Sequence, residues 1–214
     1  MRSKVGPNGK RGRPLAAALA AATLLALVSA GCTGRAAVEL EPDGAGSAEV
    51  IIDLDPVLIS YYRDLLGAVA TAETPVFDLA AIEERFAEER SLTLREAAIP
   101  ALGRMELSFS FSALDELAAD DRLASILDYE RVGEAGGRLS LRLNRETLPY
   151  LLSLSGIGEE SPVYYLLPPE GAEMGSQEYR EYLVWALEEY ESAERLASVL
   201  DTSAVTVDIT TPQP

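Results

Sequence analysis

The sequence predicts an α+β domain in which an antiparallel sheet of hairpins carries helices packed over one face. Segments that alternate apolar and polar residues flank Gly-containing turns, as in hairpins. Segments with apolar residues every three or four positions, as in helices, lie between these hairpins. The connections between adjacent strands are too short for the crossovers of a parallel sheet. We therefore expect one α+β domain over residues 32–214, long enough to bury its own core.

The domain is expected to open with a hairpin and continue into two helices. Residues 36–41 and 48–54 flank a Pro-Asp-Gly turn, which favours a hairpin. Apolar residues at helical spacing predict a helix over 57–70 and a second helix that begins at Asp78, its expected N-cap. The later elements are expected to be strands at 92–99 and 104–111, a short helix from Ser112, a hairpin of 127–134 with 138–143, a helix at 148–154, an irregular loop at 156–175, one long helix over 176–200 and a strand at 204–209.

The first 31 residues have the order of a secretory signal peptide. Five basic residues come first, an apolar run over residues 15–28 follows, and Ser29, Ala30 and Gly31 form a small-residue cleavage site. The apolar run is shorter than the ~20 residues of a spanning helix, so a retained membrane span is the least favoured interpretation. We expect cleavage after Gly31, which leaves Cys32 as the first residue. Cleavage after Ala30 by an ordinary signal peptidase is the alternative.

Cys32 is the only cysteine in the chain. Together with Ala30 and Gly31 it resembles the lipobox of bacterial lipoproteins, in which a small residue precedes a cysteine that is acylated. Ser29 stands where leucine is commonest in that motif. The resemblance implies a palmitate-type lipid anchor on Cys32, and several acyl chains would make membrane attachment stable.

The charge of the domain excludes one class of partner. Of the 18 Lys and Arg residues five precede Cys32, which leaves 13 against 35 Asp and Glu residues and a net charge of −22. Such a charge repels phosphate backbones and anionic lipid head groups. We expect no nucleic-acid binding, and a membrane attachment that depends on acyl chains.

The side chains that are missing exclude most catalytic chemistry. The chain has no histidine, and its two lysines, Lys4 and Lys10, lie in the signal segment. Nucleophilic pairs with histidine, histidine metal sites and Schiff-base lysines are therefore absent. We assign no catalytic residue, no metal site and no cofactor. A carboxylate-dependent, glycosidase-like hydrolase stays as the alternative, although no spacing singles out a pair of carboxylates.

The acidic clusters have simpler structural interpretations. Asp55 followed by Pro56 is typical of a helix N-cap with proline at the first helical position. Asp120 and Asp121 indicate a turn or a cap, and the Glu runs of the helices are expected to lie on solvated faces.

Aromatic residues supply the candidate ligand site. Tyr61, Tyr179 and Tyr190 have the helical spacing of core residues. Tyr164 and Tyr165 lie in the expected loop, and Trp185 lies at the edge of an apolar helical stripe. The ligand-binding candidates are therefore Tyr164, Tyr165 and Trp185, because long loops often carry function.

The start of the domain resembles the LppM-type envelope lipoproteins, in which a lipidated cysteine is followed by a strand, an Asp-Gly turn and a second strand. Val38-Glu39-Leu40, Asp43-Gly44-Ala45-Gly46 and Val50-Ile51-Ile52 carry this similarity. The resemblance implies a non-catalytic envelope domain associated with lipid or glycolipid, and it assigns no binding residues.

The sequence thus favours an exported, lipid-anchored envelope lipoprotein that binds a lipid-like ligand or an envelope protein. A structural or assembly role is a further alternative. Thr33 is not the aspartate that, in enteric lipoproteins, signals retention in the inner membrane. Outer-membrane placement is therefore favoured if the cell has an outer membrane.

Overall fold

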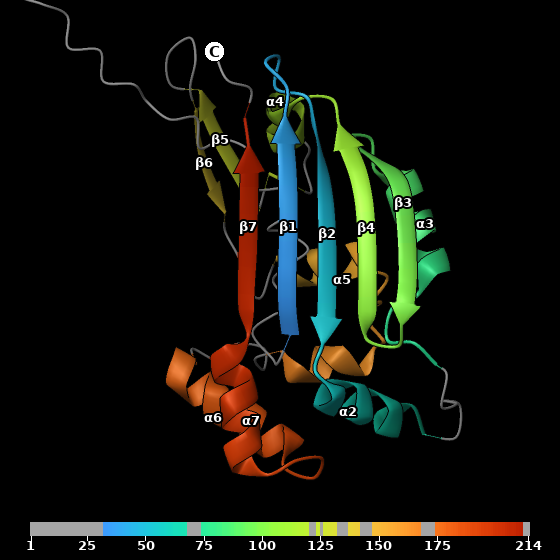
Figure 1. Ribbon diagram of the computed structural model, residues 1–214, viewed down its shortest axis with the longest axis vertical. Coiled ribbons are helices and arrows are strands. Elements are labelled where there is room, and N and C mark those ends of the chain that lie inside the picture. The colour runs from blue at the N-terminus through green and yellow to red at the C-terminus, as the bar shows by residue number, and fades with distance from the viewer. Residues whose placement is uncertain are drawn as a thin grey trace, which may run out of the picture.

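A computed structural model describes residues 32–67, 74–119, 123–124, 126–131, 137–141, 147–167 and 174–211. The expected signal segment, with Gly31, and the acidic pair Asp120 and Asp121 lie outside these ranges. Within them the chain forms the expected α+β fold, with a five-stranded sheet that is mostly antiparallel (Figure 1).

The main sheet has the strand order β3-β4-β2-β1-β7. The expected opening hairpin is present, with Cys32 paired to Leu54 at one end and Leu40 to Gly46 at the other. The C-terminal strand returns to the sheet as expected, but it runs parallel to the first strand, with Thr33 opposite Ala204. The strands are β1 (Cys32–Leu40), β2 (Gly46–Leu54), β3 (Leu92–Ala101), β4 (Arg104–Phe111) and β7 (Ala204–Thr210), and a separate hairpin joins β5 (Leu127–Arg131) to β6 (Gly137–Leu141).

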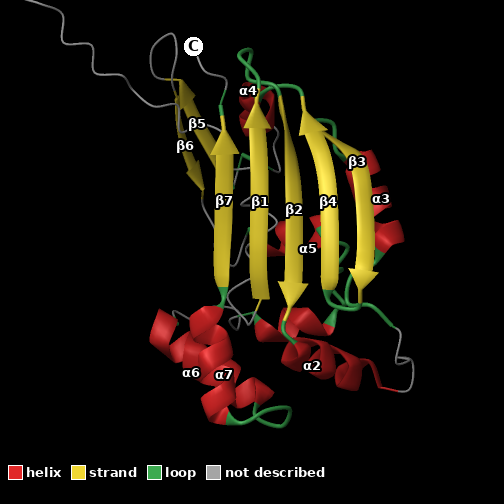
Figure 2. Cartoon of the chain, in the orientation of Figure 1, coloured by secondary structure: helices red, strands yellow, loops and turns green. Residues whose placement is uncertain are grey.

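The two faces of the sheet differ because its central strands alternate. On β1, β2 and β4 every second residue is buried, while the residues between them are exposed or half-buried. Two helices, α3 (Leu79–Glu88) and α5 (Leu148–Leu154), lie over the buried face and pack against each other, as Figures 1 and 2 show. The largest core side chains of this layer include Ile52, Ile82, Met105, Phe109 and Leu152.

A second group of helices lies beyond one end of the sheet. In Figure 1, α2 (Pro56–Leu66), α6 (Ser176–Leu187) and α7 (Ala193–Thr202) occupy the end at which β1 and β7 begin and β2 ends. The β1–β2 turn and α4 (Leu114–Ala119) lie at the opposite end. The sheet is therefore covered by helices on one face and capped by helices at one end.

Local capping explains where α2 and α3 begin. Asp55 accepts a hydrogen bond from the backbone N–H of Val57, and Asp78 accepts from those of Ala80 and Ala81. Both carboxylates satisfy backbone donors that the first helical turn leaves unpaired. The predicted capping roles of Asp55 and Asp78 are confirmed.

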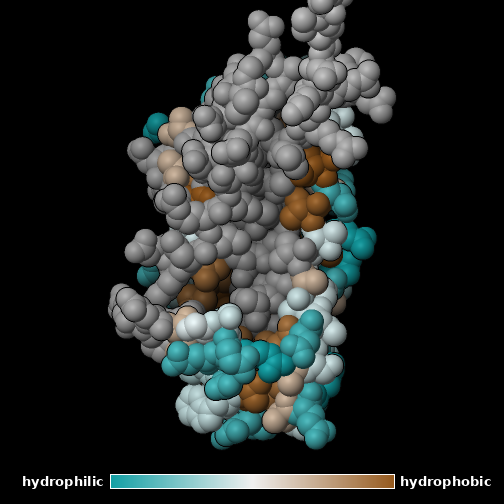
Figure 3. Space-filling model, turned by 90° about the vertical axis from the view of Figure 1, so that its left-hand side faces the viewer, coloured by the Kyte–Doolittle hydropathy of each residue, from teal (hydrophilic) through white to brown (hydrophobic). Residues whose placement is uncertain are grey.

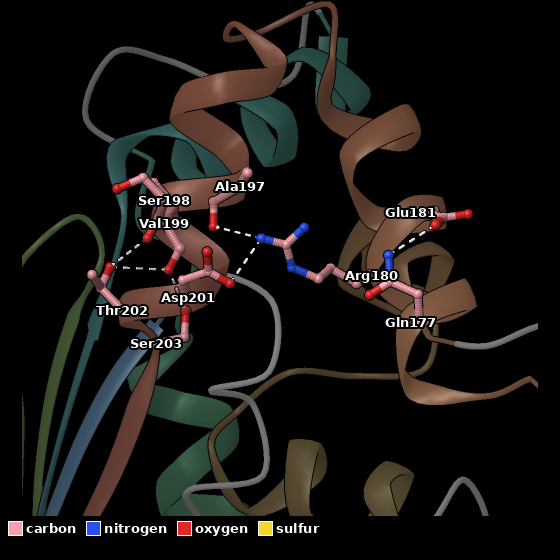
Figure 4. Close-up of polar contacts among 9 residues, drawn as sticks. All are labelled: Gln177, Arg180, Glu181, Ala197, Ser198, Val199, Asp201, Thr202 and Ser203. Atoms are coloured by element: carbon pink, nitrogen blue, oxygen red, sulfur yellow. Dashed lines mark hydrogen bonds and ion pairs between the residues drawn. The ribbon is translucent and has the colours of Figure 1, made fainter.

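The single long helix expected over 176–200 is wrong, because the structure has two helices. The hydroxyl of Ser192 accepts a hydrogen bond from Arg195 N–H and so starts α7 anew. Arg180 then reaches from α6 to the Ala197 carbonyl at 3.1 Å and to Asp201 at 2.7 Å (Figure 4). This clamp holds the two helices side by side in an arrangement that a continuous helix cannot adopt.

The irregular loop expected over 156–175 is also partly wrong. Its middle forms the 3-10 helix η3 (Pro162–Leu166), and the hydroxyl of Ser161 accepts a hydrogen bond from Val163 N–H at its start. Short 3-10 helices have poor internal hydrogen-bond geometry, so this segment depends on contacts from outside it.

Candidate functional site

Cys32 is the first residue of β1 and lies where the sheet meets the helical end of the molecule. It pairs with Leu54, the last residue of β2, and its side chain is 2% exposed. Burial raises the pKa of the Cys32 thiol far above its ordinary value, and the nearby Asp55 carboxylate raises it further. The structure thus places the expected lipidation residue in the core, where burial favours the neutral thiol.

Tyr164 packs η3 against the body of the domain. Its hydroxyl donates to the Pro149 carbonyl of α5 at 3.2 Å. Burial, with a contribution from Glu159, raises the pKa of Tyr164 to about 12. This half-buried tyrosine has an internal partner, and its hydroxyl is turned toward α5.

Tyr165 and Trp185 are by contrast exposed and connected to each other. Their exposed fractions are 67% and 66%. Tyr182, on α6, lies between them: its hydroxyl donates to the Tyr165 carbonyl at 2.6 Å, and its ring centroid is 6.1 Å from that of Trp185. We call Tyr165, Tyr182 and Trp185 the aromatic surface. Two of the three residues expected at a ligand site therefore belong to one surface, and Tyr164 does not.

Tyrosines of α2 and α6 hold this surface in place. Tyr179 stacks on Tyr182 with centroids 6.3 Å apart and donates to the Leu166 carbonyl at 2.8 Å. Tyr61 donates to the Pro162 carbonyl at 3.5 Å, a long hydrogen bond. Three carbonyls of η3 thus accept hydrogen bonds from three tyrosines, which replaces the weak internal bonding of a 3-10 helix and fixes where Tyr165 lies.

A second ring contact joins the turn after α6 to α2. The edge of Tyr190 meets Tyr61 with centroids 5.7 Å apart and planes 83° apart. Burial raises the pKa of Tyr61 to about 12, with smaller contributions from Tyr182 and Tyr165. Burial likewise raises the pKa of Tyr190 to about 12, helped by its hydrogen bond to Asp64. These hydroxyls therefore stay protonated and act as donors.

Tyr182 belongs to the aromatic surface but is not among the three candidates that the sequence singled out. Tyr179, Tyr182 and Trp185 recur at every third position, a spacing that places them along one side of a helix. The aromatic side of α6 could have been found from this spacing.

The surroundings of the aromatic surface are acidic. Glu178 and Glu181 on α6 and Glu188 and Glu189 after it are all exposed. In Figure 3 the described atoms at this end are largely hydrophilic, with hydrophobic side chains between them. Among the described residues no group of carboxylate and thiol side chains is placed to hold a metal ion. None of the helices in those ranges has the length and apolar character to span a membrane.

Contacts between helices place Cys32 and the aromatic surface at the same end of the molecule. Asp55, next to Cys32, forms an ion pair with Arg195 of α7 at 3.1 Å. The helix that Asp55 caps contacts both η3 and α6, which carry the aromatic surface. No family model, no curated protein and no solved structure matches this chain.

Proposed function

We propose that this protein is an envelope lipoprotein anchored through Cys32, and that its domain binds a lipid-like ligand or an envelope protein at the aromatic surface. The observation that carries the proposal is the exposure of Tyr165 and Trp185 at the end of the sheet where Cys32 begins β1. Large exposed aromatic side chains that lie together mark binding sites more often than isolated ones.

The chemistry of the domain supports binding rather than catalysis. Residues 32–214 contain neither histidine nor lysine, and the thiol of Cys32 is buried. A nucleophilic thiol must be ionised, and burial together with Asp55 disfavours the thiolate. Tyr61 and Tyr190, whose pKa values are raised, donate their hydroxyls to the Pro162 carbonyl and the Asp64 carboxylate of the protein itself.

Anchoring requires a covalent step at Cys32. The S–H bond breaks, a bond forms between Sγ and a carbon of an activated lipid, and the leaving group of that lipid departs with its electron pair while the thiol proton passes to solvent. The acidic domain gives the protein no basic patch with which to hold anionic lipids, so the acyl chains supply the attachment.

The anchor is tested by the intact mass of the full chain after expression in a bacterium that exports it. A mass that lacks residues 1–31 and carries lipid on an N-terminal Cys32 is expected, and Cys32→Ala should be recovered without lipid. An exported protein that begins at Gly31 or Cys32 without lipid would refute the anchor and favour ordinary secretion.

The binding site is tested by native mass spectrometry of the same exported protein, compared with its mass under denaturing conditions. A lipid or glycolipid that leaves on denaturation is expected. The double variant Tyr165→Ala, Trp185→Ala should reduce the fraction of protein that carries it. Leu79→Ala, which removes an exposed apolar side chain on α3, is the matched control. Equal ligand retention in both variants would refute the aromatic surface as the site. Crosslinking from position 185 to one reproducible protein would instead support the partner role.

A further inference from the structure

The structure leaves no spacer between the expected anchor and the folded domain. β1 begins at Cys32 itself, and its neighbour Thr33 is already paired with Asp53 and Ala204. A lipid on Sγ cannot occupy the buried position of Cys32, so the acylated residue must leave the end of the strand. Releasing one residue lengthens the connection by only ~3.5 Å. The end of the domain formed by α2, α6 and α7 therefore has to lie close to the bilayer (Figure 1).

The side chains at this end suit the boundary between lipid and water. Trp185 and Tyr165 each combine an apolar ring with a polar N–H or O–H group, and both rings are about two-thirds exposed. Such side chains concentrate where a bilayer passes from hydrocarbon to head groups. Both belong to elements fixed by hydrogen bonds, since Tyr182 holds Tyr165 and the Arg180 clamp holds α6.

Charge decides which lipids this surface accepts. The four exposed glutamates near the aromatic surface, Glu178, Glu181, Glu188 and Glu189, repel anionic head groups. The basic side chains of α6 and α7, Arg180 and Arg195, are paired with Asp201 and Asp55, and α2 adds Arg63 at this end. A zwitterionic interface is therefore the matching surface. Two aromatic side chains bind it weakly, but an anchor on the same molecule makes a weak contact sufficient by raising its effective concentration.

We propose that the aromatic surface of Tyr165, Tyr182 and Trp185 rests in the interfacial layer of the membrane that holds Cys32. The inference rests on the proposed anchor and adds an orientation. The strands point away from the bilayer, and the β1–β2 turn lies at the end of the sheet that is farther from it. Strands of nine residues place that turn ~30 Å from the start of β1.

Trp185 is the only tryptophan in the chain, so its fluorescence reports this surface without labelling. The full-length exported protein, with lipid on Cys32 verified by mass, is reconstituted into phosphatidylcholine vesicles whose acyl chains carry bromine. We expect the bromine to quench the fluorescence of Trp185. In vesicles without bromine, the emission maximum of Trp185 should lie at a shorter wavelength than in the Cys32→Ala variant measured without detergent. Tyr165→Ser should weaken the quenching, and added phosphatidylglycerol should weaken it at low salt.

The matched control moves the tryptophan to the other end of the molecule. In the double variant Glu41→Trp, Trp185→Phe the new side chain lies in the exposed β1–β2 turn and should remain unquenched. Vesicle flotation separates two failures. Protein that floats with Trp185 unquenched would overturn the interfacial orientation while leaving the anchor intact. Protein that carries no lipid and does not float would overturn the proposed anchor, and with it the premise of the orientation.

Discussion

Tyr190, in the turn after α6, donates its hydroxyl to the Asp64 carboxylate of α2 at 2.7 Å, although 126 residues separate them. The ring of Tyr190 meets Tyr61 of the same helix. Two contacts of different kinds therefore join the α6–α7 turn to α2. Since α2 follows β2 and α7 leads into β7, this junction links both ends of the domain's sequence.

Tyr190→Phe is expected to lower the free energy of unfolding by about 1 kcal/mol, because it removes one hydrogen bond to the exposed Asp64 carboxylate and keeps the ring contact. Tyr190→Ala should cost about 2 kcal/mol, since the ring contact is lost as well. Urea denaturation measures both. Asp64→Asn keeps an acceptor and serves as the control. Equal stability of Tyr190→Phe and the parent would show that the hydrogen bond contributes nothing.

Gly156 and Gly158 should respond very differently to alanine. Gly156 has φ +73°, and a Cβ there would collide with the backbone carbonyl of Asp78 and with Ile82. Gly158 has no atom within 4 Å of the corresponding position. We expect Gly156→Ala to destabilise the fold by about 2 kcal/mol and Gly158→Ala to be nearly neutral, again by urea denaturation. Matching losses in the two variants would contradict the close approach of α3 to this turn.

The thiol of Cys32 should react only when the chain unfolds. In the full chain produced without export or lipid, a maleimide should label Cys32 slowly under native conditions and rapidly in urea, because the side chain is 2% exposed and its raised pKa suppresses the thiolate. Thr33→Cys in a Cys32→Ser background, on the exposed face of β1, should be labelled in the folded state. Rapid native labelling of Cys32 would mean that the start of β1 is open in solution.

Stability should fall in alkaline solution between pH 10 and pH 12. The pKa values of Tyr61, Tyr164 and Tyr190 are raised in the folded protein from the ordinary value of 10.0 to about 12, so in this range the unfolded chain has lost protons that the folded chain retains. The contribution of these three tyrosines to the free energy of unfolding is therefore constant below pH 10 and declines as pH rises toward 12. Urea midpoints measure the decline, and ultraviolet absorbance of tyrosinate follows the late-titrating groups. Tyr164→Phe should remove one of these late-titrating hydroxyls. Titration of all tyrosines together near pH 10 would contradict the burial of Tyr61, Tyr164 and Tyr190.

Local signals predicted local structure well. The turn at Asp43, the caps at Asp55 and Asp78, and the alternation of β4 each depend on a few neighbouring residues, and each is confirmed. Features set by distant contacts were not predictable. The parallel pairing of β7 with β1 joins opposite ends of the domain. The break between α6 and α7 is stabilised by Arg180 and Asp201, which only the folded chain brings together.

The candidate site was predicted in part for the same reason. The sequence singled out Tyr164 and Tyr165 but could not distinguish them, since an unstructured loop leaves both orientations open. In a 3-10 helix consecutive side chains point in different directions, about one third of a turn apart. One tyrosine therefore faces α5 and the other faces solvent. Tyr182 connects only Tyr165 to Trp185, by a hydrogen bond to the Tyr165 carbonyl and a ring contact with Trp185. No sequence pattern predicts such a bond to a backbone carbonyl.

The pairing of β7 with β1 also determines when the sheet can be completed during synthesis of the chain. A chain that emerges from its N-terminus presents β1 early and β7 last, so one edge of β1 stays unpaired until nearly the whole domain is available. During that interval α7 is also absent, and Arg195 cannot yet pair with Asp55 beside Cys32. In the folded chain the Cys32 thiol is 2% exposed. For an enzyme that modifies Cys32 the consequence is one of timing: it has to act before the domain folds or when the start of β1 opens.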